Sequence, residues 1–161
     1  RQMCIRDRYV PEFARQFLQN KWDLKNETCD IDDLTKIAFG QIKIENEIVD
    51  KSNKILFCDT NILVTKVWSE THYGGFCPKL IKELVNVYHY DLYILTQVDI
   101  PWIKDDLRDR PNNRKDMFDI FKAELDNKKF NYLIVNGNQN TRLKMAVKFI
   151  DSYIYKLNKK H

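Results

Sequence analysis

Three short apolar segments, each followed by a helical pattern, constrain the fold of this chain more than any other feature. They are KILFCD (54–59), LYILTQ (92–97) and NYLIVNG (131–137), and all three are rich in β-branched or aromatic residues. Continuous apolar strands that alternate with helices are typical of a parallel sheet covered on both faces. The sequence therefore predicts an α/β fold with a doubly wound parallel sheet.

Helical periodicity surrounds these segments. Residues 11–20 predict a helix that begins at Pro11, and residues 22–27 a polar connector. A long helix is expected within residues 29–52, with aspartates at its start, where the helix dipole favours negative charge. Further helices are expected at 61–72, 78–89, 113–129 and 141–157.

The ends of the predicted strands carry polar residues. Ligands of doubly wound sheets bind beyond the carboxyl ends of the strands. Asp59 ends the first segment, Gln97 and Asp99 follow the second, and Gly137 and Asn138 follow the third. We expect these residues to gather at one edge of the sheet.

Composition excludes several classes of protein. The 161 residues fit a single domain, and no apolar run approaches the roughly 18 residues that span a bilayer. The four cysteines, Cys4, Cys29, Cys58 and Cys77, form no CxxC pair, so a zinc knuckle is disfavoured. Without a signal-peptide pattern, they are expected to be reduced thiols of a cytoplasmic protein.

The charge pattern disfavours a nucleic-acid partner, and no membrane partner is expected either. The net charge is only +4, and the most basic stretch, residues 104–116, interleaves arginines and lysines with aspartates. A dedicated nucleic-acid binder usually shows a concentrated basic stripe. The expected partner is a small molecule, and no oligomeric state is predicted.

The first eight residues, RQMCIRDR, do not continue into the pattern that follows. We expect residues 1–8 to be a non-native leader. Residues 9–161 would then form a single, partial domain.

The triplet Asp59-Thr60-Asn61 resembles the PIN-type metal-dependent ribonucleases, in which such a motif follows an apolar strand. That resemblance implies a cluster of carboxylates around divalent metal ions. However, the matching later strand ends in Asn136-Gly137-Asn138, which contains no acid.

A second resemblance extends over most of the chain. It is carried by VPEFAR (10–15), LFCDTNILVTKVWSE (56–70), DIPWIKDDLRDRPNNR (99–114), MFDIFKAEL (117–125) and TRLKMAVKFID (141–151). These segments resemble the NadR-like P-loop kinases, a family founded on phosphorylation of nicotinamide riboside in NAD salvage. The resemblance implies a three-layer P-loop NTPase-like fold with a parallel sheet flanked by helices, ATP and Mg²⁺ as cofactors, and a nucleoside-like substrate.

The chain departs from that family in one respect. The phosphate-binding loop G-x-x-x-x-G-K-[ST] is absent, and none of Gly40, Gly74, Gly75 and Gly137 stands in its spacing. Backbone N–H groups of that loop cradle the phosphates. We expect the first strand and the P-loop to precede residue 9, and the chain to be inactive alone. A noncatalytic nucleotide-binding or regulatory module, or an ATPase of other specificity, stays an alternative.

The kinase resemblance places Asp59 at the acid of a Walker-B-like strand. There it would be both a catalytic and a metal-binding residue, holding magnesium through water or accepting the proton of the substrate hydroxyl. Its structural alternative is to cap the following helix.

The resemblance also implies a lid within residues 104–114, whose composition is polar. Arg108 and Arg114 would be catalytic and Arg110 would belong to the lid, because guanidinium groups stabilise the charge on a transferred phosphoryl group. A solvated, charge-balanced surface segment is the alternative.

Three further residues are candidates for substrate binding. Glu12 and Arg15 lie one helical turn apart and would hold ribose hydroxyls, or else form a surface ion pair. Trp102 would stack on a planar ring of the ligand, or else seal the core beside the lid.

Overall fold

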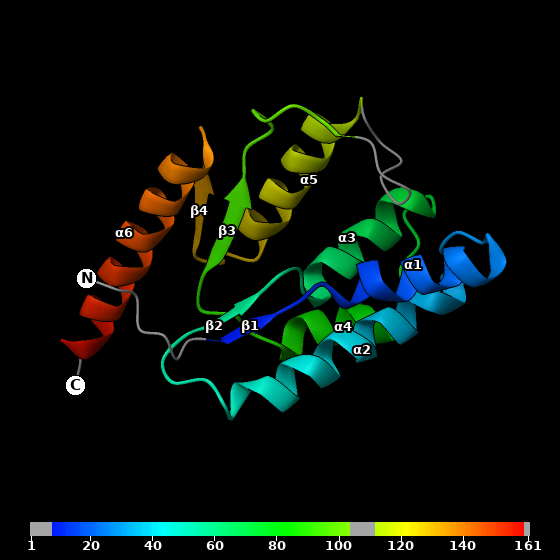
Figure 1. Ribbon diagram of the computed structural model, residues 1–161, viewed down its shortest axis with the longest axis horizontal. Helices are drawn as coiled ribbons and strands as arrows, with labels where there is room; N and C mark the ends of the chain where they lie inside the picture. The colour runs from blue at the N-terminus through cyan, green and yellow to red at the C-terminus, as the bar shows by residue number, and fades with distance from the viewer. Residues whose placement is uncertain (1–7, 104–111, 160–161) are drawn as a thin grey trace. The chain divides into compact units, whose positions relative to one another are not determined.

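The computed structural model describes residues 8–103 and 112–159, and the chain divides into two compact units. Unit 1 comprises Arg1–His89 and unit 2 comprises Tyr90–His161. Each unit has its own pair of strands and its own helices, which Figure 1 labels.

In unit 1, β1 (Arg8–Val10) pairs in parallel with β2 (Leu56–Cys58). The ladder is continued at both ends, because Arg8 N–H donates to Ile55 O at 3.2 Å and Asp59 N–H donates to Val10 O at 2.9 Å. Parallel pairing therefore brings the chain that leaves β1 next to Asp59. The sequence did not predict β1, which is only three residues long.

Four helices complete unit 1. They are α1 (Phe13–Lys25), α2 (Ile31–Val49), α3 (Ile62–His72) and α4 (Lys79–Val87). Helix α2 packs against α1, α3 and β1, so it is the central element of the unit. The long predicted helix is confirmed as α2, with Asp30 as its N-cap. The core of the unit consists of buried apolar side chains: Val10, Leu34, Ile37, Ala38, Ile42, Ile62, Leu63, Val67, Cys77, Ile81 and Val85.

Helix α1 runs further than the sequence predicted. The expected polar connector at 22–27 is wrong over its first four residues, because Trp22–Lys25 is helical. The helix ends where Asn26 adopts a left-handed conformation with φ 55°, and its N–H donates to Trp22 O. Polar composition suggested a loop here, although it reflects the exposed surface of a helix.

In unit 2, β3 (Tyr93–Thr96) pairs in parallel with β4 (Tyr132–Val135), in register from Tyr93↔Tyr132 to Thr96↔Val135. Helices α5 (Arg114–Asn127) and α6 (Gln139–Asn158) flank this pair, as Figure 1 shows. Leu125 and Val135 are its fully buried apolar residues among those that the structure describes.

The α/β class, the parallel pairing and the alternation of strands with helices are confirmed. The single continuous sheet is not: the strands within residues 8–103 and 112–159 form two separate two-stranded ladders. The predicted strands supply both strands of the β3–β4 pair but only β2 of the other pair, and β1 supplies the partner of β2. None of the helices within those ranges combines the length and apolar content that a membrane crossing requires.

Candidate functional site

An open groove of about 490 Å³ lies in unit 1, where the chain leaves β1 and β2. It brings together three residues that the sequence singled out in two motifs, Asp59 in one and Glu12 and Arg15 in the other. The full lining is Tyr9, Pro11, Glu12, Arg15, Gln16, Gln19, Asn20 and Asp59.

The groove is built by one strand end and one helix face. Asp59 directly follows β2, and Glu12 is the N-cap residue of α1. Arg15, Gln16 and Gln19 follow at intervals of three and four residues, so they lie on the same side of α1. The sequence held this signal, because the polar positions of α1 repeat with helical spacing, but only Glu12 and Arg15 were recognised.

Asp59 accepts a hydrogen bond from a residue that sequence reasoning missed. The hydroxyl of Tyr9 donates to Asp59 Oδ2 at 2.9 Å, across the β1–β2 pair. This hydrogen bond, partial burial and the charges of Asp59 and Glu12 all raise the pKa of Tyr9. The carboxylate of Asp59 is exposed and its partner is neutral, so its negative charge remains available to a ligand.

Asp59 does not cap the following helix. Asn61 is the N-cap of α3, and its Oδ1 accepts from Leu63 N–H at 3.0 Å and from Val64 N–H at 3.3 Å. Asn61 is buried, whereas Asp59 is exposed. Helix capping, the structural alternative for Asp59, is therefore excluded.

The residue between them has a strained backbone. Thr60 has φ 66°, a left-handed conformation that β-branched residues rarely adopt. Such strain costs on the order of 1–3 kcal/mol and persists where the surrounding structure enforces it, often at functional sites. Here it turns the chain between the exposed carboxylate of Asp59 and the buried cap of Asn61.

Glu12 and Arg15 form the ion pair that their spacing of three residues allows. Arg15 Nε lies 3.4 Å from Glu12 Oε2, with the two side chains 47% and 30% exposed. An ion pair this exposed contributes little to stability. Together with Asp59 they give the groove two carboxylates and one guanidinium, a set suited to the hydroxyl groups of a sugar.

Unit 2 contains a second cluster at strand ends. Asp99, which follows β3, accepts hydrogen bonds from Gly137 N–H and from the guanidinium of Arg142. Arg142 also donates to Gly137 O at 2.9 Å and to Gln97 O at 3.0 Å. Gln97, Asp99 and Gly137 are grouped as predicted, but Asp59, which was expected at the same edge, follows β2 of the other ladder, and Asn138 caps α6. Arg142 was missed, since it stands inside a helical pattern.

Two more predicted site residues lie in unit 2. Trp102 is half-buried in a segment without regular structure. Arg114 begins α5, where the helix dipole disfavours a cation, so its position does not serve the stability of the helix. Arg108 and Arg110 lie outside the described residues, and the roles of all four stay predictions.

The residues fit a magnesium ion held mainly by water. Among the residues that the structure describes, no group of three or more His, Cys, Asp or Glu side chains could hold a metal together. One exposed carboxylate, such as Asp59, is the arrangement in which Mg²⁺ keeps most of its waters and takes further ligands from phosphates.

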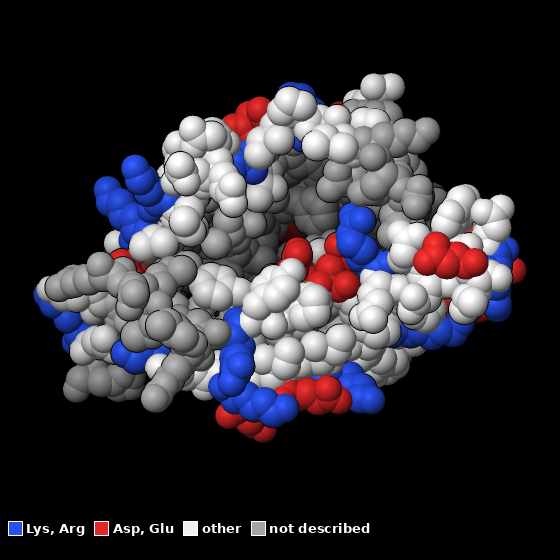
Figure 2. All heavy atoms as spheres, in the orientation of Figure 1, with Lys and Arg blue, Asp and Glu red and all other residues white. Residues whose placement is uncertain are grey.

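On the face drawn in Figure 2, positive and negative side chains are interspersed.

Comparison with known proteins decides the family. The model of the AAA domain matches residues 5–142, which is most of the chain. The chain belongs to the AAA domain family. Membership implies the P-loop fold and nucleotide binding, whereas the resemblance to PIN-type ribonucleases is confined to the triplet at Asp59.

Two curated relatives support the likeness of this AAA domain to NadR. It is 28% identical over 97 residues to the trifunctional NAD biosynthesis/regulator protein NadR of Salmonella typhimurium, covering 60% of this chain and 23% of the relative. It is 33% identical over 76 residues to the protein of the same name from Escherichia coli, covering 47% of this chain and 18% of the relative. The AAA domain thus spans about a fifth of the length of these relatives.

Proposed function

We propose that this AAA domain is the substrate-binding and catalytic part of an ATP-dependent small-molecule kinase of the cytoplasm, and that nicotinamide riboside is its substrate. The observation that carries the proposal is the groove of unit 1, which gathers Asp59, Glu12 and Arg15. The likeness to NadR, whose name states a part in NAD biosynthesis, supports the choice of substrate.

The groove residues suit transfer of a phosphoryl group to a sugar hydroxyl. Glu12 and Arg15 bind ribose hydroxyls and orient the substrate on the surface of α1. Asp59 accepts the proton of the attacking hydroxyl or holds magnesium through water, and Tyr9 fixes the orientation of its carboxylate. Bound ATP with Mg²⁺ supplies the phosphoryl group and neutralises part of its charge. Arg108, Arg110 and Arg114 stabilise the remaining charge, and Trp102 stacks on a planar ring.

The proposal includes a three-layer fold completed by an additional strand and a P-loop. Each sheet contains two parallel strands within the described residues, and a strand leaves backbone groups on its outer edge for pairing. A parallel strand that precedes the loop G-x-x-x-x-G-K-[ST] would pair along such an edge. Its phosphate-binding backbone would then stand at the carboxyl end of the strands.

The test uses a protein in which a strand and a G-x-x-x-x-G-K-[ST] loop from a related kinase precede residue 9, called the P-loop-restored protein below. With ATP, magnesium and nicotinamide riboside, it should form ADP and the phosphorylated nucleoside in equal amounts. A variant with the loop lysine replaced by alanine is the matched control. ATP binding without turnover of any nucleoside would favour the noncatalytic module, and ATP hydrolysis alone would favour an ATPase of other specificity.

The ribonuclease alternative has its own test. If Asp59 served a PIN-type site, the chain of 161 residues would cleave single-stranded RNA in magnesium or manganese, and Asp59→Ala would abolish the cleavage. The kinase proposal expects no cleavage by either protein.

A further inference from the structure

Helix α1, which forms one side of the groove, is only weakly attached to the rest of unit 1 by apolar contacts. Helix α1 carries the groove residues Arg15, Gln16 and Gln19, and none of its residues, all of which the structure describes, is fully buried. The apolar side chains of α1, such as Phe13, Phe17 and Leu18, are only half-buried, so the helix gains less from the hydrophobic effect than a core helix does. The position of α1 therefore depends on a few specific contacts with α2.

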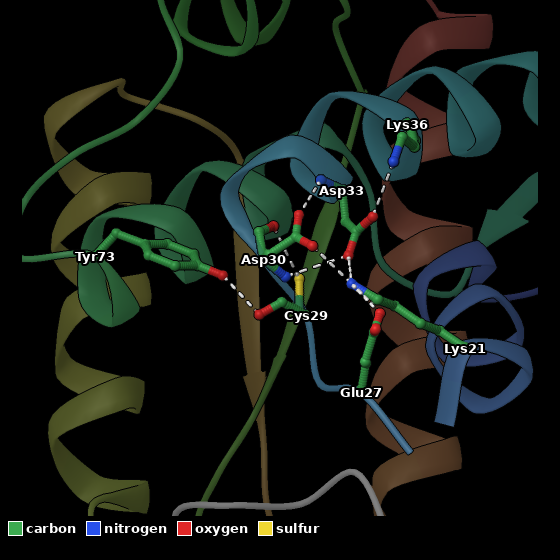
Figure 3. A network of polar contacts seen from close by, with 7 residues as sticks. All are labelled: Lys21, Glu27, Cys29, Asp30, Asp33, Lys36 and Tyr73. Atoms are coloured by element: carbon green, nitrogen blue, oxygen red, sulfur yellow. Dashed lines mark hydrogen bonds and ion pairs between the residues drawn. The ribbon is translucent and has the colours of Figure 1, made fainter. Parts of the chain in front are cut away.

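One of these contacts is ionic, and Figure 3 shows it from close by. Lys21 of α1 places Nζ 2.7 Å from Asp30 Oδ2 and 2.6 Å from Asp33 Oδ2, at the start of α2. Glu27 lies further away, at 3.8 Å. The side chain of Lys21 is 12% exposed and that of Asp33 only 3%, so both groups are largely withdrawn from water.

The two aspartates are also held in place by hydrogen bonds that do not involve Lys21. Asp33 N–H donates to Asp30 Oδ1 at 3.0 Å, and Asp30 N–H donates to Asp33 Oδ2 at 3.2 Å, which makes a reciprocal capping box. Hydrogen bonds to Asp30 and then to Asp33 raise the pKa of Lys21. Burial would raise the pKa of Asp33, but hydrogen bonds from Lys21, the Asp30 backbone and Lys36 hold it below its ordinary value.

Lys21 belongs to the face of α1 that contacts α2. Phe13, Phe17 and Lys21 recur every four residues, and the rings of Phe13 and Phe17 stack at 5.9 Å. At the other end of the helix, Phe13 N–H donates to Gln41 Oε1 at 3.0 Å, and its ring lies where a methyl group at Gly40 would be 2.2 Å away. Helix α1 is thus fixed at both ends, by Phe13 and by Lys21.

We propose that Lys21 is a positioning residue for the groove: its ion pairs with Asp30 and Asp33 set the place of α1, and thereby of Glu12 and Arg15, relative to Asp59. Lys21 itself does not line the groove. The effect of Lys21 on substrate binding rests on the proposed kinase function, whereas its effect on the position of α1 does not. Loss of the anchor weakens substrate binding more than the chemical step.

The first measurement needs no substrate. In the 161-residue chain, Lys21→Met should raise the amide hydrogen-exchange rates of α1 by roughly tenfold, because the ionic contact between α1 and α2 is lost. Exchange in α3 should not change. Lys36→Met is the matched control: Lys36 also contacts Asp33, at 3.1 Å, but belongs to α2 and is 60% exposed, so it should leave α1 unaffected. Equal exchange of α1 in both variants would overturn the proposal.

The second measurement separates positioning from folding. In the P-loop-restored protein, Lys21→Met should raise the KM for nicotinamide riboside by roughly fivefold to thirtyfold with kcat within about twofold, as expected when binding alone is weakened. Lys21→Arg, which keeps the charge, should restore most of the affinity.

Asp30→Asn provides a milder variant in case Lys21→Met unfolds the protein. Asparagine caps helices as well as aspartate, and the side chain of Asp30 is 56% exposed, so the fold should persist while one charge partner is lost. A KM raised by roughly twofold to fivefold is expected. Faster exchange of α1 with unchanged KM in both Lys21→Met and Asp30→Asn would show a structural role only. Absence of all turnover in the parent protein would instead refute the kinase function and leave the exchange result standing.

Discussion

Asp59 in unit 1 and Asp99 in unit 2 occupy similar places in the chain, yet their surroundings differ. Each is an acid that closely follows a parallel strand. Asp59 meets the neutral hydroxyl of Tyr9, whereas Asp99 meets the guanidinium of Arg142 and the backbone N–H of Gly137. A carboxylate at a strand end is therefore not sufficient evidence of a catalytic site, because its partner decides whether its charge is available.

The partners of Asp99 and Asp59 have opposite consequences for the charge of the two carboxylates. The hydrogen bond from Gly137 and the guanidinium of Arg142 lower the pKa of Asp99, and Arg142 is only 15% exposed. The charge of Asp99 thus holds together the segments that leave β3 and β4. Asp59 lacks a cationic partner among the contacts that the structure describes, and it faces a groove.

The largest expected effect contrasts the two acids directly. In the P-loop-restored protein, Asp59→Asn should lower kcat by roughly a hundredfold or more, since it removes a proton-accepting or metal-holding group. Asp99→Asn should change kcat by less than roughly threefold, because the ion pair of Asp99 with Arg142 acts on stability and not on the chemical step. Steady-state kinetics with nicotinamide riboside decide the matter. Equal losses in both variants would show that the comparison is mistaken.

The arginines extend the contrast. Arg108→Ala and Arg114→Ala should each depress kcat by roughly tenfold to a thousandfold with a smaller change in KM, because each removes an oriented donor to the transferred phosphoryl group. Lysine should rescue only partly, since it lacks the planar fork. Normal turnover by both alanine variants would make residues 104–114 a solvated surface segment.

Arg142 should behave differently from those arginines. Arg142→Gln removes the contacts with Gln97, Asp99 and Gly137, so it should lower the Tm by roughly 4–8 °C, as expected for a loss near 1 kcal/mol in a small unit. Calorimetry would measure the shift. An unchanged Tm with a large fall in kcat would instead move Arg142 into the active site.

Tyr9 offers a smaller effect on the side of Asp59. Tyr9→Phe removes the hydroxyl that donates to Asp59 at 2.9 Å but keeps the ring. One neutral hydrogen bond contributes about 0.5–1.5 kcal/mol, so kcat/KM should fall by roughly twofold to tenfold. Kinetics of this variant beside Asp59→Asn would show whether the hydroxyl orients the carboxylate. A loss as large as that of Asp59→Asn would indicate that Tyr9 itself takes part in the chemistry.

The sequence predicted those features that depend on local pattern. Apolar runs located β2, β3 and β4, and periodicity located α1 through α6, although α1 runs further than expected. Motif positions identified Asp59, Glu12 and Arg15, which the groove brings together. The features that were missed depend on contacts across the chain. β1 is too short to show a pattern and exists through its pairing with β2, and Tyr9 and Arg142 acquire their partners only in the folded units.

The pH dependence of stability separates the two acids with the smallest expected effect. The folded-state pKa of Asp99 is lowered, so its contribution to stability is full above the ordinary aspartate value of about 3.9 and disappears as the pH falls through the lowered value. The pKa of Tyr9 is raised, so its contribution is full below about 10 and disappears as the pH rises through the raised value.

Thermal unfolding from pH 2 to pH 11 would test both signs. Relative to the parent protein, Asp99→Asn should lose stability at pH 7 and show a smaller further loss below about pH 4, because the group that titrates is gone. Tyr9→Phe should be less stable than the parent by a constant amount up to about pH 10, and the difference should shrink as the pH rises further, because the parent then loses the contribution of its tyrosine. If Asp99→Asn retained the full acid-dependent loss, the ion pair with Arg142 would not contribute to stability. The carboxylates Asp59 and Asp99 would then differ in position alone.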